Sequence, residues 1–420
     1  MVRPTAISKS ATTALWLLLV INLFNYIDRQ VLAAVEPEIR ATFFASNDLN
    51  AMAKTGLLGT AFLVTYMLSA PILGFLADRI SRWVIVGAAV ILWSLASGGS
   101  GLAASFGILF ATRIWVGIGE GGYGPAAPTI LADHYPIETR GFIMAIFCAA
   151  IPVGSALGYV IGGAISAHLS WRWAFYLVAP PGLLLGLLCF FQRDPRVASH
   201  HLVQKSPRRS LRDYLRLFQT RSYLLNCIAQ TLMTFAAGGL GYWVSAYLSY
   251  RNQSPAAGRT IFGLITVVAG LSSTLIGGIV ADKLRPRYAG SYFWVSGIGM
   301  LIACPIFVVS LYIPFPAAWV AMFLAIFFLF LNTGPSNTAL ANVSLPAVRA
   351  TAFAVNIFVI HALGDVQAFW LLGYIGGHTN IRVAFVFVSG IILLSGLAWL
   401  IGTKYLPADT AAVEKAIAAA

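Results

Sequence analysis

The stretch RIWVGIGEGGYGPAAP, residues 113–128, decides the fold class, because it places two charged residues inside a segment that is otherwise apolar and long enough to cross a membrane. On a helix, one face of this stretch carries Arg113, Gly117, Glu120 and Gly124. An ionisable group at the centre of a bilayer costs about 2.5 to 3.5 kcal/mol on insertion scales, so such groups are rare and mark substrate or proton paths. We therefore expect this face to line a cavity rather than contact lipid.

The composition of the whole chain agrees with a membrane location. Of its 420 residues, 59% are hydrophobic and 10% are charged, with a mean hydropathy of +0.82, which leaves too little polar surface for a soluble globule. We predict an all-α polytopic membrane protein with twelve transmembrane helices, each arising from an apolar segment of about 20 residues. These segments are 13–35, 54–77, 83–103, 106–132, 141–167, 173–191, 222–249, 260–281, 291–312, 317–341, 351–375 and 383–402.

The basic residues predict the orientation. If both termini are cytoplasmic, nineteen of the 27 lysines and arginines fall in cytoplasmic segments and only six in outer loops. The positive-inside rule favours this arrangement, in an inner or plasma membrane. Basic residues dispersed beside anionic lipid also argue against a nucleic-acid partner. The first apolar run continues to about Val35 without a clean cleavage site, so we expect it to be retained as the first helix.

The longest hydrophilic stretch, Gln192 to Arg221, separates six predicted spans from six. It divides the chain into an N-terminal six-helix bundle, residues 1–191, a cytoplasmic linker, residues 192–221, and a C-terminal six-helix bundle, residues 222–420. Apolar residues at helical spacing within the linker, with arginines on the other faces, favour a helix that lies in the membrane interface.

An internal repeat supports the division into two halves. Gly74 and Asp78 recur 204 positions later as Gly278 and Asp282. Gly124-Pro125 recurs 210 positions later as Gly334-Pro335. Because the two offsets are nearly equal, the second six spans duplicate the first in parallel, and parallel repeats of this kind can rock about a central cavity.

The loop motif that is repeated resembles that of the major facilitator superfamily of transporters. Its residues here are Gly74, Asp78, Arg79 and Arg82, with a weaker echo at Gly278, Asp282, Lys283 and Arg285. The resemblance implies a gating role, in which the acid is set against a helix terminus and basic residues and latches one conformation. A carboxylate near a helix N-terminus is stabilised by the helix dipole.

Three further motifs in the first half are similar to the Spinster family of lipid transporters. They are Asn25-Tyr26-Ile27-Asp28-Arg29, the run 113–128 and the stretch IPVGSALGY at 151–159, followed by Trp171-Arg172-Trp173. The resemblance covers about residues 25–181, and the second half departs into generic superfamily sequence. It implies a proton-coupled transporter of an amphiphilic lipid, such as a lysophospholipid or sphingosine phosphate.

Asp28 and Glu120 lie at similar depths in the first and fourth predicted spans, so we expect a buried cluster with Arg113, and with Arg29 at its edge. Burial favours the neutral form of a carboxyl group, whereas a neighbouring arginine favours its ionised form. A carboxyl group that alternates between a hydrated state and a state paired with arginine can therefore bind and release a proton. Asp28 is our first candidate for the proton carrier and Glu120 the second. Arg113 would hold the ionised acid or bind an anionic headgroup. A static ion pair between two helices is the alternative.

Several polar residues are candidates for contacting the substrate. Those of the first half are Asn25, Tyr26, Arg29, Arg113 and Glu120, and those of the second half are Asn332, Asn337, His361 and Asp365. Asp365 lies near the middle of its span, so it too is expected to face the cavity. Gly154, Gly158 and Gly162 form a stripe in the fifth span, which indicates either close helix packing or a seam that limits leakage.

Other classes of protein find no support in the sequence. It has no GxxxxGK[ST] loop for ATP, no selectivity filter, no catalytic constellation and no cysteine or histidine cluster, so we expect neither an enzyme nor a bound metal or cofactor. The partners expected are membrane lipids, an amphiphilic substrate and protons, and nothing demands more than a monomer. Two alternatives to the lipid transporter remain: a drug or organic-anion transporter of the same fold, and a lipid-binding sensor or scramblase without proton coupling.

Overall fold

A computed structural model describes residues 9–77, 79–135, 137–194, 219–345 and 349–418, and all regular secondary structure in these residues is helical. Eleven helical stretches in this part of the chain are long and apolar enough to span a membrane, and two of them, Ala317–Asn342 and Ala352–His378, contain more than one helix. The predicted fourth span also forms a helix, α5 (Phe106–His134), but it is not among the eleven. Arg113, Glu120 and the many glycines of α5 reduce its hydropathy, so its burial depends on neighbouring helices.

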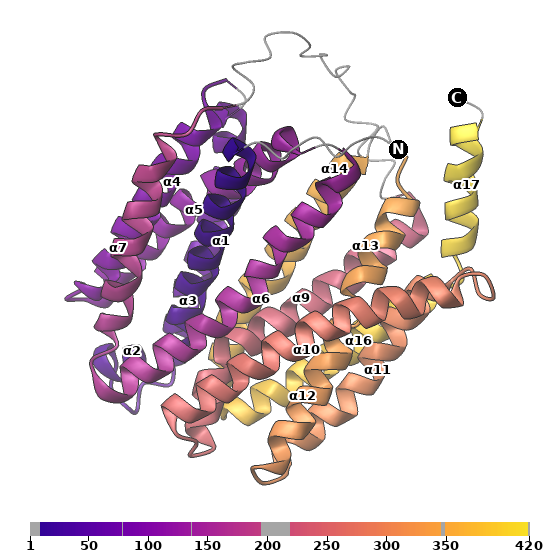
Figure 1. Cartoon of the computed structure of the whole chain (residues 1–420). Helices are drawn as coiled ribbons and strands as arrows, with labels where there is room; N and C mark the ends of the chain where they lie inside the picture. The colour runs from indigo at the N-terminus through magenta and orange to yellow at the C-terminus, as the bar shows by residue number, and fades with distance from the viewer. Residues whose placement is uncertain (1–8, 78, 136, 195–218, 346–348, 419–420) are drawn as a thin grey trace. The chain divides into compact units, whose positions relative to one another are not determined.

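The first half of the chain supplies seven described helices. They are α1 (Lys9–Ala34), α2 (Glu36–Phe43), α3 (Ala51–Ala77), α4 (Arg82–Gly101), α5, α6 (Ile137–His168) and α7 (Arg172–Cys189). Helix α1 packs mainly against α6, whereas α4 packs between α5 and α7 (Figure 1). The short helix α2 was not predicted as a separate element, and it follows α1 directly with Pro37 in its first turn.

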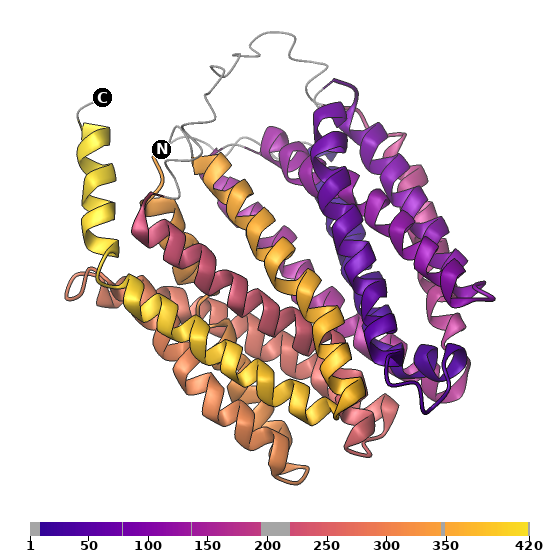
Figure 2. The ribbon, with the colours of Figure 1, turned by 180° about the vertical axis from the view of Figure 1, so that it is seen from behind.

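The second half begins with α9 (Arg221–Tyr250), α10 (Pro255–Leu284) and α11 (Ser291–Tyr312). The predicted tenth span is divided into α12 (Ala317–Phe330) and α13 (Thr333–Asn342). The predicted eleventh span consists of α14 (Arg349–Ile360), a π-helical segment η2 (His361–Asp365) and α15 (Val366–His378). Helix α16 (Ile381–Gly402) packs against α9 and α11, as Figure 2 shows, and α17 (Leu406–Ala418) ends the described chain.

The chain forms two compact units. The first comprises Met1–Ser46, Leu57–Lys205 and Arg251–Gly263, and the second comprises Asn47–Gly56, Ser206–Tyr250 and Leu264–Ala420. Helices α3 and α10 therefore each begin in one unit and continue in the other. The division into bundles 1–191 and 222–420 stays a prediction, and most of the predicted linker lies outside the described residues.

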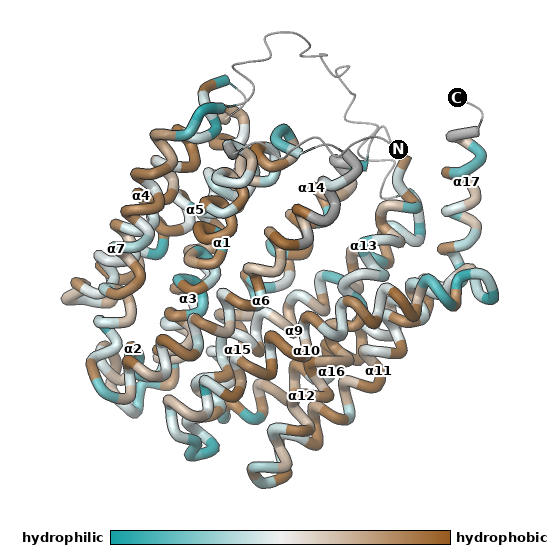
Figure 3. The backbone as a smooth tube through the Cα atoms, in the orientation of Figure 1, coloured by the Kyte–Doolittle hydropathy of each residue, from teal (hydrophilic) through white to brown (hydrophobic). Residues whose placement is uncertain are grey.

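Polar and apolar residues are distributed along the helices as a membrane requires. Figure 3 shows hydrophobic residues along the helices and hydrophilic ones gathered at many of their connections. The glycine stripe of α6 faces α1, because a Cβ atom added to Gly158 would lie 2.6 Å from the Cβ of Gln30 and 2.7 Å from the carbonyl oxygen of Ile27. The close-packing interpretation of this stripe is therefore confirmed, and it brings α1 near enough to share a polar cluster with its neighbours.

Candidate functional site

The central contact of the candidate site is an ion pair between α1 and α5. The Nε and Nη2 atoms of Arg29 both lie 2.6 Å from the Oε2 atom of Glu120. Glu120 is buried, whereas the Arg29 side chain is 22% exposed. The carboxylate is thus withdrawn into the protein, and its cation is accessible to other ligands.

Three aromatic rings surround the Arg29 guanidinium group. Its central carbon lies 5.0 Å from the ring centroids of Tyr26 and Phe62 and 5.2 Å from that of Tyr66. Such contacts within about 6 Å attract a cation to the ring faces. The rings of α1 and α3 therefore give the guanidinium contacts besides its ion pair with Glu120.

Asp28 and Arg113 lie on the other side of the cluster and bind serines of α4. Ser97 donates a short hydrogen bond to the Oδ1 atom of Asp28, and Arg113 donates one to Ser100. Asp28 is 1% exposed and Arg113 is 2% exposed, and Arg113 is close enough to act electrostatically on Asp28. In the described part of the chain the Oδ2 atom of Asp28 is buried and accepts no hydrogen bond.

The structure thus brings together the predicted residues. Glu120 pairs with Arg29, the residue expected at the edge of the cluster. The face of α5 that carries these charges is also packed rather than open. A Cβ atom on Gly117 would overlap Thr65 and the carbonyl oxygen of Phe62 on α3. The glycines we expected to line a cavity instead allow α3 to approach the α5 backbone.

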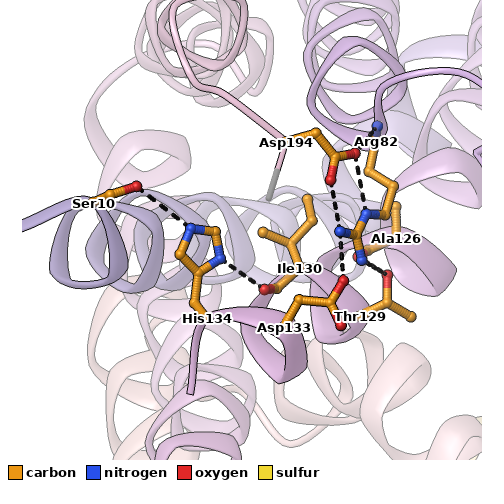
Figure 4. Close-up of polar contacts among 8 residues, drawn as sticks. All are labelled: Ser10, Arg82, Ala126, Thr129, Ile130, Asp133, His134 and Asp194. Atoms are coloured by element: carbon orange, nitrogen blue, oxygen red, sulfur yellow. Dashed lines mark hydrogen bonds and ion pairs between the residues drawn. The ribbon is translucent and has the colours of Figure 1, made fainter. Parts of the chain in front are cut away.

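A second polar cluster surrounds Arg82, the first residue of α4 and part of the predicted gating motif. Its Nη2 atom lies 2.6 Å from Asp194 Oδ1 and 2.6 Å from Asp133 Oδ2, and its Nη1 donates to Thr129 at 3.2 Å (Figure 4). Asp194 also accepts from the Arg82 backbone nitrogen at 2.8 Å, so a carboxylate caps the α4 N-terminus. Next to this cluster, His134 Nε2 lies 3.5 Å from Ser10 Oγ of α1.

The other residues of the predicted gating motifs have simpler surroundings. Asp78 lies outside the described residues. Gly74 faces Pro125 of α5, and the Arg79 guanidinium lies 3.5 Å from the ring centroid of Phe75. In the echo of the motif, Asp282 Oδ1 accepts a 2.8 Å hydrogen bond from Tyr292 and the neighbouring Lys283 is exposed.

The candidates of the second half do not form one cluster. His361 Nδ1 and Asp365 Oδ2 lie 3.0 Å apart on the π-helical segment, a type of element that often marks functional sites. Asn332 is fully buried at the break between α12 and α13, where it donates to the carbonyl oxygen of Leu329 at 2.5 Å. Asn337 is exposed and donates to its own helix.

Sequence reasoning missed a buried amide network in the second unit. Gln230 of α9 donates to Ser336 of α13 at 2.9 Å and accepts from Asn356 of α14 at 2.6 Å. Asn226 accepts from Trp399 of α16 at 2.9 Å. Polar residues spaced at i and i+4 in α9 were the available signal, but their partners are more than 100 residues away. In the described part of the chain, no group of histidine, cysteine or acidic side chains could hold a metal ion.

Comparisons with known proteins identify the family. A model described as the Major Facilitator Superfamily matches residues 18–366. The chain is 32% identical to Protein spinster of Drosophila melanogaster over 89% of this chain and 63% of that protein's length. It is also 32% identical to Protein spinster homolog 3 of Danio rerio, over 94% and 85%, and to the sphingosine-1-phosphate transporter SPNS2 of Xenopus tropicalis, over 87% and 74%.

Solved structures share the fold. A bacterial homolog of the human lysosomal transporter Spinster superposes with a TM-score of 0.82 over 96% of this chain and 98% of its own, at 22% identity. A D-xylose–proton symporter gives a TM-score of 0.76 over 93% and 97%, at 16% identity. The family model and the curated relatives show that the molecule is a polytopic membrane transporter rather than an enzyme. The chain belongs to the major facilitator superfamily and, within it, to the Spinster family.

Proposed function

We propose that this transporter moves an amphiphilic lipid with an anionic headgroup, of the lysophospholipid or sphingosine-phosphate type, and that protons drive it. The observation that carries the proposal is the pair of Arg29 with Glu120, in which the acid is buried and the cation stays partly exposed inside an aromatic cage. The relatives that are named sphingosine-1-phosphate transporters support a phosphate-bearing substrate.

Exchange of partners at Arg29 couples the proton to the headgroup. Where Glu120, the second candidate for the proton carrier, takes the proton, it loses the charge that holds Arg29, and the guanidinium can then bind a phosphate through two parallel hydrogen bonds. Loss of that proton restores the ion pair and displaces the headgroup. Asn25 and Tyr26 lie on the same helix and orient the bound headgroup.

Asp28 is the first candidate for the proton carrier. It is buried, one of its oxygens accepts from Ser97, and the other accepts no hydrogen bond from the described residues. A neutral carboxylic acid fits such surroundings better than a carboxylate, since a buried charge requires several partners. Arg113, fixed by Ser100, favours the ionised form after the proton has left.

The remaining roles follow the two-bundle arrangement. We propose that bundles 1–191 and 222–420 alternate in exposing the substrate, with both termini cytoplasmic in an inner or plasma membrane, and that the transporter acts as a monomer. Gly74, Asp78, Arg79 and Arg82, with Asp282 and Lys283 in the second half, form the gating motifs. In the second half, His361, Asp365, Asn332 and Asn337 contribute to substrate selection.

The test is transport of a labelled lysophospholipid into proteoliposomes, with and without an imposed pH gradient. Native protein is compared with Asp28→Asn and Glu120→Gln, and with Glu414→Gln as a control, because Glu414 is an exposed acid of α17. We expect gradient-driven flux to be lost in Asp28→Asn or Glu120→Gln while lipid binding survives, and to be retained in the control.

Other outcomes would favour the alternatives. Flux that ignores both the gradient and the two substitutions would contradict proton coupling and favour a sensor or scramblase. Displacement of the lipid by a soluble organic anion, with flux of that anion, would favour a drug or organic-anion transporter of the same fold.

A further inference from the structure

A buried arginine in the first unit has no role in the proposed proton and headgroup site. Arg259 lies in the second turn of α10 and is 1% exposed. Its Nη2 atom donates to both carboxylate oxygens of Glu38, at 2.8 and 3.0 Å, and its Nη1 donates to Ser166 at 2.5 Å. One guanidinium group therefore joins the start of α10 to α2 and α6.

Glu38 lies on α2, and aromatic contacts hold this short helix against its neighbours. Phe43, in the last turn of α2, packs edge-on against Trp171 at 6.0 Å and Phe106 at 6.4 Å, and Trp171 donates to Thr42 at 3.0 Å. These contacts attach α2 to the starts of α5 and α7. This cluster lies at the opposite end of α1 from the Arg82 cluster, because the α1 N-terminus contacts His134, next to Asp133.

The start of α10 also fits closely against α6. A Cβ atom on Gly163 would lie 3.0 Å from the Cβ of Arg259, and one on Gly263 would lie 2.9 Å from the carbonyl oxygen of Ala156. Tyr159 and Phe262 pack edge-to-face at 5.3 Å. The helices beside the ion pair are thus closely packed, with glycines at two of the points of contact.

The repeat gives this contact a counterpart in the second unit. Helices α3 and α10 are the repeat-related pair, and the offset of 204 that relates Gly74 to Gly278 also relates Thr55 to Arg259. The start of α3 belongs to the second unit, where Tyr242 donates to the carbonyl oxygen of Thr55 at 2.6 Å. The start of α10 is thus held by an ion pair at Arg259. The start of α3 is held at the equivalent position, Thr55, by a neutral hydrogen bond.

We propose that Arg259, Glu38 and Ser166 form a releasable clasp that holds the start of α10 on the first unit and opens in each transport cycle. The proposal rests on the alternating access that is part of the proposed function. It makes these three residues the gate on the predicted outer side of the membrane. An ion pair suits this role because the attraction between buried Arg259 and partly exposed Glu38 is offset by the hydration that both charges gain when they separate. Because Arg259 binds both carboxylate oxygens of Glu38, α10 returns to the same position on α2 each time the ion pair forms again.

The first experiment measures distance in the full-length protein in lipid nanodiscs. Spin labels are placed on Ala41→Cys and Ala257→Cys, two exposed positions on α2 and α10, after the four native cysteines have been replaced. We expect Glu38→Gln and Arg259→Gln to increase the longer-distance population at least threefold. The exchanged pair Glu38→Arg with Arg259→Glu should return it toward the native value, and Glu414→Gln should leave it unchanged.

The second experiment uses a disulfide to link α6 to the start of α10, so that the clasp cannot open. Gly163→Cys with Arg259→Cys brings two Cβ atoms to the separation of a disulfide after a shift of a few tenths of an ångström. Oxidation should lower lipid flux at least tenfold, and a reductant should restore it, whereas neither single variant should respond. Thermal unfolding of every variant separates misfolding from gating.

Two results would overturn the clasp: distance distributions identical in native protein and both neutral variants, or undiminished flux through the oxidised double variant. The distance result depends neither on which substrate is carried nor on proton coupling, whereas the flux result requires that the lipid is transported. The distance result stands even where the lipid-flux and pH-gradient tests of the proposed function fail, so the two failures can be told apart.

Discussion

Arg29 and Glu120 form an ion pair in which the two partners differ in access: the Glu120 side chain is 0% exposed and that of Arg29 is 22% exposed. The partner of the buried acid can therefore be reached by a ligand while the acid itself cannot. Because Tyr26, Phe62 and Tyr66 hold the guanidinium from the sides, a headgroup needs only to compete with Glu120 for its donors.

Arg29→Gln should weaken binding of a phosphate-bearing lysolipid about 10- to 100-fold, since hydrogen bonds to charged groups contribute about 1.5 to 3 kcal/mol each. Arg29→Lys should recover part of this loss, because lysine keeps the charge but not the two-pronged geometry. Equilibrium binding of a fluorescent lysophosphatidate in detergent measures both, with the uncharged monoacylglycerol as the control ligand. Equal losses for the two ligands would contradict a headgroup role.

The Arg82 cluster makes a prediction about stability. Arg82→Gln should lower the free energy of unfolding by about 3 to 5 kcal/mol, because the buried carboxylate of Asp194 then loses its ion pair with Arg82. Asp133→Asn should cost less than about 1 kcal/mol, since the Asp133 side chain is 41% exposed. Denaturant unfolding in one detergent compares the two, and similar costs would mean that Asp194 does not depend on Arg82.

The sequence predicted the helical class and the residues of the charged cluster, because hydropathy and buried charges are local signals. It did not predict that Glu120 binds Arg29. That pairing depends on how α5 packs among its neighbours, and Gly117 allows α3 to approach the α5 backbone closely. No pattern within a single helix carries this information.

The partners of Arg82 and Arg259 were missed for the same reason. Asp133 and Asp194 follow different apolar segments, and each resembles an ordinary charged residue at the end of a span. Glu38 lies 221 positions from Arg259. Only the packing of distant helix ends brings these charges together, so the sequence gives the residue types of such contacts but not their pairing.

The glycine stripe of α6 predicts a position-specific effect of size. Gly158→Ala should lower the free energy of unfolding by about 1 to 3 kcal/mol, because its added Cβ atom would overlap Gln30 and the Ile27 carbonyl of α1. Gly390→Ala on α16 is the matched control, since an added Cβ meets nothing within 4 Å. Thermal unfolding measures both changes. Equal stability of the two variants would show that α1 yields to the larger side chain.

The amide network of the second unit predicts coupling between distant helices. Gln230→Ala should cost about 1 to 3 kcal/mol, because it leaves Ser336 and Asn356 buried without a partner. Asn356→Ala should cost a similar amount, and the double variant should cost clearly less than the two single effects combined, because each substitution removes the same hydrogen bond. Asn337→Ala is the control, since Asn337 is exposed and bonds only its own helix. Additive costs in a double-mutant cycle would mean that α9 and α14 are held together by apolar packing instead.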